Sequence, residues 1–368
     1  MDLALYQPGG GYYTSSTDRW GGGRGGGGGG DYITNLDISP VFAVTIAKEV
    51  YGMWTSLDSP PLFRLIEPGA GRGWLSKGIV ATARERYPDF YEALGAHLIE
   101  KNPALRETAT GKVSWHENIE DIEGLGTGFI GCILSNEFFD SLPFHRVVRR
   151  EDGLKEIYVG LDKGRLVDVE EEPSTGDIPR YFEDAGIALA PGHKAEAGLL
   201  AVEWMGRAAA LMERGYVLTI DYGYPAEELY APGPGRKDGT LLCHFRNTLN
   251  DDPYRNVGSQ DITAHVDFTG LVRAGRDAGM EPMGFATQSE FLLGLGIMEE
   301  LQEVGEGGGG APGDYDKIKH NQGIKELIMP GGVGDTFKVL TQGKGVGNSG
   351  LKGFSFKNRL SSISGGRA

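Results

Sequence analysis

The glycine-rich stretch after residue 66 constrains the fold of this chain more than any other feature. An apolar run, Leu62 to Ile66, is followed by Glu67-Pro68-Gly69-Ala70-Gly71-Arg72-Gly73 and then by a helical pattern. Glycines at alternate positions let a backbone turn sharply and approach a ligand closely, and a helix begins with unpaired N–H groups at the positive end of its dipole. The stretch therefore predicts a strand, a tight loop and a helix that bind a nucleotide-type cofactor.

The glycine spacing and the next acidic residue indicate which cofactor this is. The spacing is Gly-x-Gly-x-Gly, not the Gly-x-Gly-x-x-Gly of dinucleotide sites. A second predicted strand, residues 95–100, ends at Glu100, which lies 29 residues after Gly71 rather than the roughly 20 of a dinucleotide site. We therefore expect the S-adenosylmethionine (SAM) site of a class I methyltransferase, with Glu67, Gly69 and Gly71 at the methionine end and Glu100 at the ribose. The alternative is two buried strand ends with ordinary turn chemistry.

A polar cluster follows the most apolar strand of the chain. Residues 129–134 have the composition of a central parallel strand, and they lead into Ser135-Asn136-Glu137-Phe138-Phe139-Asp140. Open α/β sheets place their chemistry at the carboxyl ends of strands. An amide oxygen and a carboxylate can orient N–H bonds, and aromatic faces attract a sulfonium or a guanidinium. The cluster predicts a site for a nitrogen acceptor; alternatively, Asn136 and Asp140 cap the next turn.

Three further residues are candidates for the same chemistry. The predicted strand 216–221 ends at Asp221, and the spacing of His265 and Asp267 places both on one face of a strand. Together with His244 they match no known metal-ligand spacing. We therefore expect His265 to form hydrogen bonds in a polar pocket, and no metal is predicted.

Charge and cysteine content narrow the functional class and the compartment. The net charge of −15, from 36 basic and 51 acidic side chains, disfavours nucleic-acid binding. Two cysteines give neither a disulfide framework nor a metal cage, which favours a reducing compartment. No stretch approaches the ~18 apolar residues of a membrane span, and the chain opens without a signal peptide or an Arg-rich presequence. The sequence thus indicates a cytosolic protein.

The alternation of predicted strands and helices indicates an α/β fold. We expect a class I, Rossmann-like, seven-stranded methyltransferase fold with an antiparallel insertion and extra helices. The insertion is marked by two alternating strands around Asp162-Lys163-Gly164, a hairpin signal, and by a long helix from about 193 to 214. The expected division is an N-terminal cofactor-covering segment at 1–60, a core at 61–146 and 215–342, the insertion (hairpin plus helix) at 147–214, and a disordered Gly/Ser/Lys tail at 343–368.

Several segments along the chain form a recognisable set. They are Gly11-Tyr12-Tyr13, residues 30–34, Asp37-Ile38-Ser39, residues 67–73, residues 136–143, Ile220-Asp221-Tyr222-Gly223, residues 261–268, Met329-Pro330 and Phe337-Lys338-Val339-Leu340. Taken together, these segments resemble the MidA-like family, which includes the mitochondrial complex I assembly-factor arginine methyltransferases and their bacterial relatives. Two departures stand out: Asp37 replaces a glutamate common in the family, and glycine runs precede Asp31 and occupy 307–310.

This resemblance implies a SAM-dependent methyltransferase and, by analogy with the mitochondrial members, ω-N-methylation of an arginine in a respiratory complex I subunit. We expect a protein substrate of the NADH dehydrogenase subunit type and a bacterial cytoplasmic location, with the mitochondrial matrix as the alternative. The remaining expected roles are these: Gly30, Asp31 and Thr34 close over the cofactor, Asn136 contacts it, Glu137 and Asp140 accept the proton, and Asp221, His265 and Asp267 are second choices for that step.

Three alternatives stay open at this point. The acceptor could be another protein nitrogen or a nucleic-acid base, although the acidic balance disfavours the base. The chain could also be a non-catalytic assembly chaperone that binds its client through the insertion. A nucleotide-dependent oxidoreductase would need a glycine spacing that this loop lacks. The sequence does not predict the oligomeric state.

Overall fold

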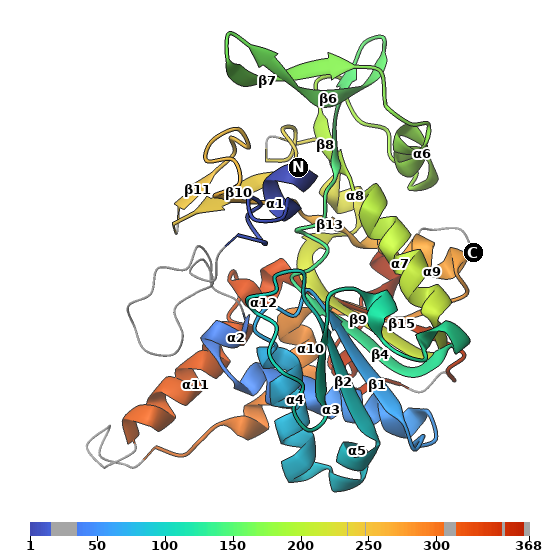
Figure 1. Cartoon of the computed structure of the whole chain (residues 1–368), viewed down its shortest axis with the longest axis vertical. Coiled ribbons are helices and arrows are strands. Elements are labelled where there is room, and N and C mark those ends of the chain that lie inside the picture. The colour runs from blue at the N-terminus through green and yellow to red at the C-terminus, as the bar shows by residue number, and fades with distance from the viewer. Residues whose placement is uncertain (16–34, 234, 247, 305–313, 348–349, 364–368) are drawn as a thin grey trace.

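A large mixed sheet forms the centre of the protein. The computed structural model describes residues 1–15, 35–233, 235–246, 248–304, 314–347 and 350–363 (Figure 1). The strand order is β14-β15-β9-β4-β1-β2-β3, and the short β13 (Val266–Asp267) also pairs with β9. The strands are β1 (Phe63–Pro68), β2 (Leu94–Ile99), β3 (Val113–His116), β4 (Phe129–Asn136), β9 (Met212–Tyr224), β14 (Glu281–Thr287) and β15 (Phe337–Lys344).

The direction of the strands matches the predicted α/β fold. Neighbouring strands from β3 to β9 are parallel, whereas β15 runs antiparallel to both β9 and β14. The predicted strands at 62–66, 95–100 and 129–134 are therefore confirmed as β1, β2 and β4. Because β1, β2 and β4 are parallel neighbours, their carboxyl ends lie at the same edge of the sheet.

Helices cover both faces of this sheet, as the alternation of side chains along its strands requires (Figure 1). Phe63, Leu65 and Leu134 face a core with α3 (Val41–Ser56), α4 (Trp74–Arg86), α5 (Pro88–Ala93), α10 (Gln288–Gly294) and α11 (Asp314–Ile328). Ile66, Ile133 and Val217 face a second core with α7 (Leu199–Leu211) and α9 (Phe268–Asp277).

Two smaller sheets lie beside the main one. The first has the order β7-β6-β5-β8 and the second β11-β10-β12, and α1 (Asp2–Tyr6) packs on the second. Lys163 and Gly164 have φ of 48° and 80°, which a two-residue hairpin turn requires, so the predicted hairpin is confirmed. The elements are β5 (His145–Arg150), β6 (Gly153–Asp162), β7 (Arg165–Glu171), α6 (Asp177–Asp184), β8 (Lys194–Ala197), β10 (Leu242–Phe245), β11 (Thr248–Asn250) and β12 (Asp261–Thr263).

The remaining short elements connect these layers. They are α2 (Asn35–Ile38), α8 (Ala226–Leu229), α12 (Val333–Thr336) and the 3₁₀ turns η2 (Ile119–Asp121), η3 (Leu125–Thr127), η4 (Ile297–Glu300), η5 (Lys352–Phe354) and η6 (Leu360–Ser362). In the described parts of the chain, none of the helices combines the length and the hydropathy that crossing a bilayer requires.

The predicted long helix from 193 to 214 is wrong at both ends. Residues 194–197 form β8, because Ala195 and Ala197 alternate into a buried face where β8 pairs with β5. The helix α7 begins only after Gly198. At the other end β9 already starts at Met212, and Gly215, the expected helix stop, lies inside this strand against the backbone of Gly131.

The expected disordered tail is also wrong for residues 350–363. Leu351 and Phe354 are buried in the core that contains α3 and α10, and Ile363 is buried on the other face of the sheet. The Gly353 N–H donates to Oε2 of the buried Glu49 at 3.1 Å. The helix of the insertion, α7, packs on the main sheet. Otherwise, the division of the chain into core, covering segment and insertion stays a prediction.

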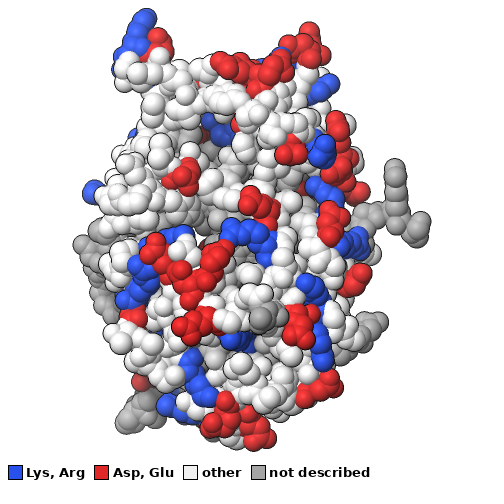
Figure 2. Space-filling view, turned by 45° about the vertical axis from the view of Figure 1, so that its right-hand side comes forward, with Lys and Arg blue, Asp and Glu red and all other residues white. Residues whose placement is uncertain are grey.

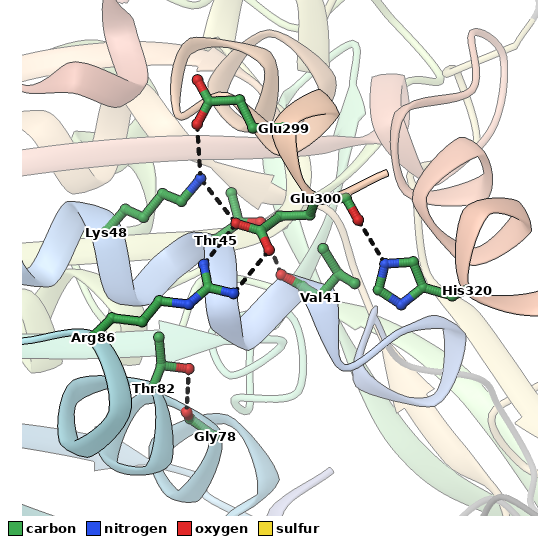
Figure 3. A network of polar contacts seen from close by, with 9 residues as sticks. All are labelled: Val41, Thr45, Lys48, Gly78, Thr82, Arg86, Glu299, Glu300 and His320. Carbon is green, nitrogen blue, oxygen red and sulfur yellow. Dashed lines mark hydrogen bonds and ion pairs between the residues drawn. The ribbon is translucent and has the colours of Figure 1, made fainter. Parts of the chain in front are cut away.

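An ion-pair network ties the segment after α10 to α3 and α4 (Figure 3). Lys48 Nζ lies 3.3 Å from Glu299 and 3.1 Å from Glu300, and Arg86 donates two hydrogen bonds to Glu300 at 2.7 and 3.0 Å. The Arg86 hydrogen bonds are the largest cause that lowers the pKa of Glu300 to about 2. The helices that flank β1 are therefore fixed to each other.

Charged side chains of both signs lie on the face that Figure 2 presents. Figure 2 shows acidic and basic side chains next to each other across the face that it presents.

Close contact of β1 with β4 at Gly131 yields a stability prediction. A Cβ at Gly131 would overlap the backbone of Arg64, so Gly131→Ala should lower the free energy of unfolding by about 3 kcal/mol. Urea denaturation measures this change. The control Gly126→Ala places its Cβ in open space and should stay within about 0.5 kcal/mol of the wild type. Equal denaturation midpoints for the two variants would contradict the described register.

Candidate functional site

A cavity of about 790 Å³ opens at the carboxyl ends of β1, β2 and β4. Segments far apart in sequence surround it, and they include the glycine loop, the end of β2, the turn after β3, the loop after β4, α1 and α7. Its lining includes Tyr6, Tyr13, Asp37, Glu67, Gly69, Gly71, Arg72, Glu100, Lys101, Glu117, Asn118, Asn136, Glu137, Phe138, Ser141 and Trp204.

The glycine loop has the backbone that its sequence predicts. Gly69, Gly71 and Gly73 have φ of 65°, 54° and 68°, a left-handed region that favours glycine. A Cβ at Gly69 would lie 2.9 Å from the Phe138 ring. The Ala70 N–H donates to the Ile99 carbonyl at 3.0 Å, which holds the loop against β2. At its glycines the loop therefore presents backbone to the cavity.

The two acids expected to bind the cofactor are buried beside this loop. Glu67 is 5% exposed and accepts the Ser76 N–H at 3.1 Å, while Glu100 is 6% exposed and accepts the N–H groups of Gly71 at 2.9 Å and Asn102 at 2.7 Å. Burial raises the pKa of Glu67 to about 7 and also raises the pKa of Glu100, whereas these N–H groups favour the charged forms. Both carboxyl groups line the cavity.

A chain of side-chain amides orients Glu137. Asn136 Nδ2 donates to Glu137 Oε1 at 3.0 Å, and Asn35 Nδ2 donates to Asn136 Oδ1 at 3.4 Å. Behind them, Gln288 Nε2 donates to Asn35 Oδ1 at 3.0 Å and to the Leu327 carbonyl at 3.2 Å. Gln288 and Asn35 are almost fully buried, so this chain fixes the Glu137 carboxyl group from the core side.

Glu137 is the acid of the β4 loop that faces the cavity. Its φ of 54° is unusual for a residue other than glycine. Burial and then the charge of Asp221 raise the pKa of Glu137 to about 8, and Asp37 adds a smaller contribution. Next to it, Phe138 packs edge-on against Trp204 with ring centroids 4.8 Å apart. A carboxyl group of raised pKa thus stands beside aromatic faces.

Asp221 accepts hydrogen bonds from the backbone of this loop. Its side chain is fully buried, and its Oδ2 accepts the N–H groups of Phe138 at 3.1 Å and Phe139 at 2.9 Å. Its Oδ1 accepts the Tyr222 N–H at 2.8 Å. Burial is the main cause that raises the pKa of Asp221 to about 7, and these N–H groups oppose it. Asp221 does not line the 790 Å³ cavity.

Asp140, His265 and Asp267 border a second, smaller cavity of about 30 Å³. Asp140 and Asp267 are 8% and 6% exposed, and Asp267 caps α9 by accepting the Gly270 N–H at 3.0 Å. Burial raises the pKa of Asp140 and lowers that of His265 to about 4. Neither Asp140 Oδ1 nor His265 Nδ1 has a hydrogen-bond partner among the described residues. Asp140 belongs to the same loop as Glu137, and His265 and Asp267 follow β12, but all three border a different cavity from the one that Glu137 lines.

The predicted site residues therefore fall into three groups. Gly30, Asp31 and Thr34 lie outside the described residues. The large cavity brings together Glu67, Gly69, Gly71, Glu100, Asn136 and Glu137, whereas Asp140, Asp221, His265 and Asp267 lie outside its lining.

Sequence reasoning missed several lining residues. Glu117 and Asn118 follow β3 directly and could have been found by the rule that located Glu100, since both are polar residues at a strand end. Tyr6 and Trp204 reach the cavity from α1 and α7. No spacing in the sequence connects them to the glycine loop.

Comparisons with known proteins agree with this geometry. Residues 45–286 match the family described as "Putative S-adenosyl-L-methionine-dependent methyltransferase". Similar curated proteins include the mitochondrial protein arginine methyltransferase NDUFAF7 of Danio rerio, 28% identical over 84% of this chain and 76% of the relative. The Drosophila melanogaster homologue is 26% identical over 86% of this chain and 75% of the relative.

Solved structures extend the comparison to the whole fold. A COG1565 superfamily member from Burkholderia thailandensis, crystallised with S-adenosyl-homocysteine, is 28% identical and superposes with a TM-score of 0.83. The alignment covers 98% of this chain and 90% of that structure. A second structure of a COG1565 superfamily protein from this organism gives a TM-score of 0.80 at 29% identity. The class I fold predicted from the sequence is therefore confirmed.

Proposed function

The chain belongs to this family of SAM-dependent methyltransferases, and from that premise we propose that it transfers a methyl group to an arginine side chain of a protein. The choice of arginine as the acceptor rests on one observation: the carboxyl group of Glu137 is held in the cavity wall beside aromatic rings. Two similar proteins, from Danio rerio and Drosophila melanogaster, are named protein arginine methyltransferases, which supports the same choice.

The residues around the glycine loop fit the cofactor of the family. When bound, SAM supplies a methyl group on a positively charged sulfur. We assign Glu67, Gly69 and Gly71 to its methionine end and Glu100 to the ribose, because these residues line one side of the cavity together. Asn136, Phe138 and Trp204 line the same cavity, and we assign Asn136 to the cofactor. Gly30, Asp31 and Thr34 keep their predicted role of closing over the cofactor.

Glu137 performs the proton chemistry in this proposal. A guanidinium has a pKa above 12, so it enters the site with its positive charge and loses a proton as the methyl group is added. The Glu137 carboxylate orients the N–H bonds of the guanidinium and accepts that proton. Aligning the reacting atoms and excluding water from them supplies up to ~7–11 kcal/mol of the rate enhancement.

The other predicted acids receive supporting roles. Asp221 is a positioning residue, because its carboxylate holds the N–H groups of Phe138 and Phe139. Asp140 was expected to accept the proton with Glu137, and His265 and Asp267 were second choices; because all three border the small cavity, they are positioning residues in our proposal. The proposed target is a subunit of the respiratory NADH dehydrogenase type in the bacterial cytoplasm, or in the mitochondrial matrix as the alternative, as the MidA-like resemblance implies.

Methyl transfer can be tested directly. The purified chain is incubated with SAM carrying a deuterated methyl group and with purified NADH dehydrogenase subunits, and the products are mapped by mass spectrometry. We expect the label on arginine nitrogen of one subunit. Label on lysine or on another nitrogen would overturn the choice of acceptor. Calorimetric SAM binding without any transfer would favour the assembly chaperone instead.

The raised pKa of Glu137 predicts how the rate depends on pH. The carboxylate form increases as pH rises through the pKa of about 8, so kcat/KM should rise across this range and level off above it. A bound guanidinium favours the carboxylate, so kcat should rise at a lower pH than kcat/KM. Initial rates at several pH values, with saturating and limiting acceptor, measure both profiles. A kcat/KM that is constant from neutral to alkaline pH would argue against Glu137 as the base.

A further inference from the structure

Two tyrosines of the N-terminal segment, residues 1–15, form one wall of the large cavity. Tyr6 and Tyr13 both line it, and their rings stack with centroids 5.3 Å apart and planes 28° apart. The Tyr6 hydroxyl donates to the Ser141 carbonyl at 3.2 Å, and the Tyr13 hydroxyl donates to Asp261 Oδ1 at 2.7 Å. The sequence matched Tyr13 and Asp261 to the family as separate segments, and the structure joins them.

These hydrogen bonds fix the rings in place. Ser141 belongs to the loop that carries Glu137, and Asp261 begins β12 and is 4% exposed. The Tyr6 ring is therefore attached to the loop that carries Glu137, and the Tyr13 ring to the three-stranded sheet β11-β10-β12. Burial and nearby carboxylates, among them Asp261 and Asp140, raise the pKa of Tyr6, so its hydroxyl stays neutral. A fixed, neutral ring presents its face to a ligand at low entropic cost.

The acidic and basic residues of the cavity lining differ in their partners. Asp2, Asp37 and Glu137 line the cavity together with the two tyrosines, and Asp2 and Tyr6 belong to the same helix, α1. The basic residues of the described lining each have a partner next to the glycine loop or after β3: Arg72 stacks over Trp74, and Lys101, Arg106 and Arg207 contact Asn118, Glu117 and Glu120 respectively. Each described basic residue of the lining is thus already paired, whereas acidic and aromatic residues line the same cavity.

We propose that Tyr6 and Tyr13 form the aromatic wall of the acceptor subsite and select a cationic side chain over a neutral one of the same shape. A planar cation attracts the negative face of an aromatic ring and gains more when water is excluded. Glu137 binds the N–H edge of the guanidinium, while the tyrosine rings cover its flat face. That the acceptor is an arginine side chain rests on the proposed function. The preference of the two tyrosines for a cation can be measured without methyl transfer.

The test compares two peptides that differ only in charge. Acetyl-Gly-Gly-Arg-Gly-Gly-amide and its citrulline counterpart are titrated by NMR into the protein saturated with S-adenosyl-homocysteine. The wild type should bind the arginine peptide about tenfold more tightly than the citrulline peptide. Tyr6→Leu should reduce this ratio to below about threefold, whereas Tyr6→Phe, which keeps the ring, should retain most of it. The Kd for S-adenosyl-homocysteine should change less than about twofold in each variant.

Matched controls make the outcome specific. Tyr315→Leu changes a tyrosine that is 75% exposed on α11 and should behave like the wild type. If Tyr6→Leu does not fold, as its melting curve will show, Tyr13→Leu removes the other ring of the wall and should lower the ratio in the same way.

Three results would overturn the proposal: no arginine preference in the wild type, an unchanged preference in the folded leucine variant, or an equal loss of S-adenosyl-homocysteine binding. If the wild type prefers the arginine peptide but transfers no methyl group, the proposed function is contradicted, whereas the proposed role of Tyr6 and Tyr13 is supported.

Discussion

The Glu137→Gln variant should lose about 10²–10⁴-fold in kcat for methyl transfer, the range of general-base catalysis. Glutamine keeps the size of the side chain and can still accept the hydrogen bond from Asn136 Nδ2, but it cannot take a proton. Calorimetry with SAM should give a Kd within about threefold of the wild-type value, because Glu137 is proposed to contact the acceptor and not the cofactor.

The matched control for this variant is Glu85→Gln, an exposed residue of α4, which should keep the wild-type rate. If Glu137→Gln kept most of its activity, the base would have to be another group, and Asp140 would be the next residue to change. A parallel loss of SAM binding would show that Glu137 belongs to the cofactor side of the cavity.

The Asp221→Ala variant should lose about 3 kcal/mol of folding stability together with most of its activity. Three backbone N–H groups, those of Phe138, Phe139 and Tyr222, would lose their acceptor, and each unpaired buried group costs about 1–3 kcal/mol when the site relaxes only partly. Asp221→Asn keeps one accepting oxygen and should lie between the alanine variant and the wild type. Urea denaturation and initial rates measure the two effects.

Asp277→Ala changes an exposed aspartate of α9 and should stay within about 0.5 kcal/mol of the wild type. Measuring both stability and activity of Asp221→Ala also separates a positioning role from a direct role in the reaction. A positioning role predicts that stability and activity fall together. Full stability with lost activity would mean that Asp221 takes part in the reaction itself.

Local sequence signals were sufficient for most strands of the central sheet, though not β14, and for half of the site. Apolar runs that end in an acid located β1 and β2, a fully apolar run located β4, and the glycine loop followed from its alternate glycines. Because the carboxyl ends of parallel neighbours share one edge, Glu67, Glu100 and Glu137 could be expected in one cavity. These predictions needed only residues close together in sequence.

The rest of the site depends on backbone turns and distant contacts. Glu137 and Asp140 are three residues apart yet border different cavities, because the left-handed backbone at Glu137 redirects the loop. His265 and Asp267 were expected on one face of a strand, but β13 begins only at Val266; both residues nevertheless border the small cavity, which their spacing could not indicate. Residues 194–197 have a helix-compatible composition, and only pairing with β5 makes them a strand.

The amide chain behind Glu137 also has a consequence for how this protein folds. Its link from Gln288 to Asn35 joins residues 253 positions apart, and the Tyr13–Asp261 bond joins residues 248 apart. Forming contacts this distant in sequence requires closing long loops, which costs conformational entropy before the contacts contribute any stability. Such contacts therefore form slowly and late. During synthesis, a nascent chain that ends before residue 288 can pair β1 to β4 but lacks the partner that fixes Asn35. The large cavity is therefore among the last parts of the molecule that we expect to become ordered.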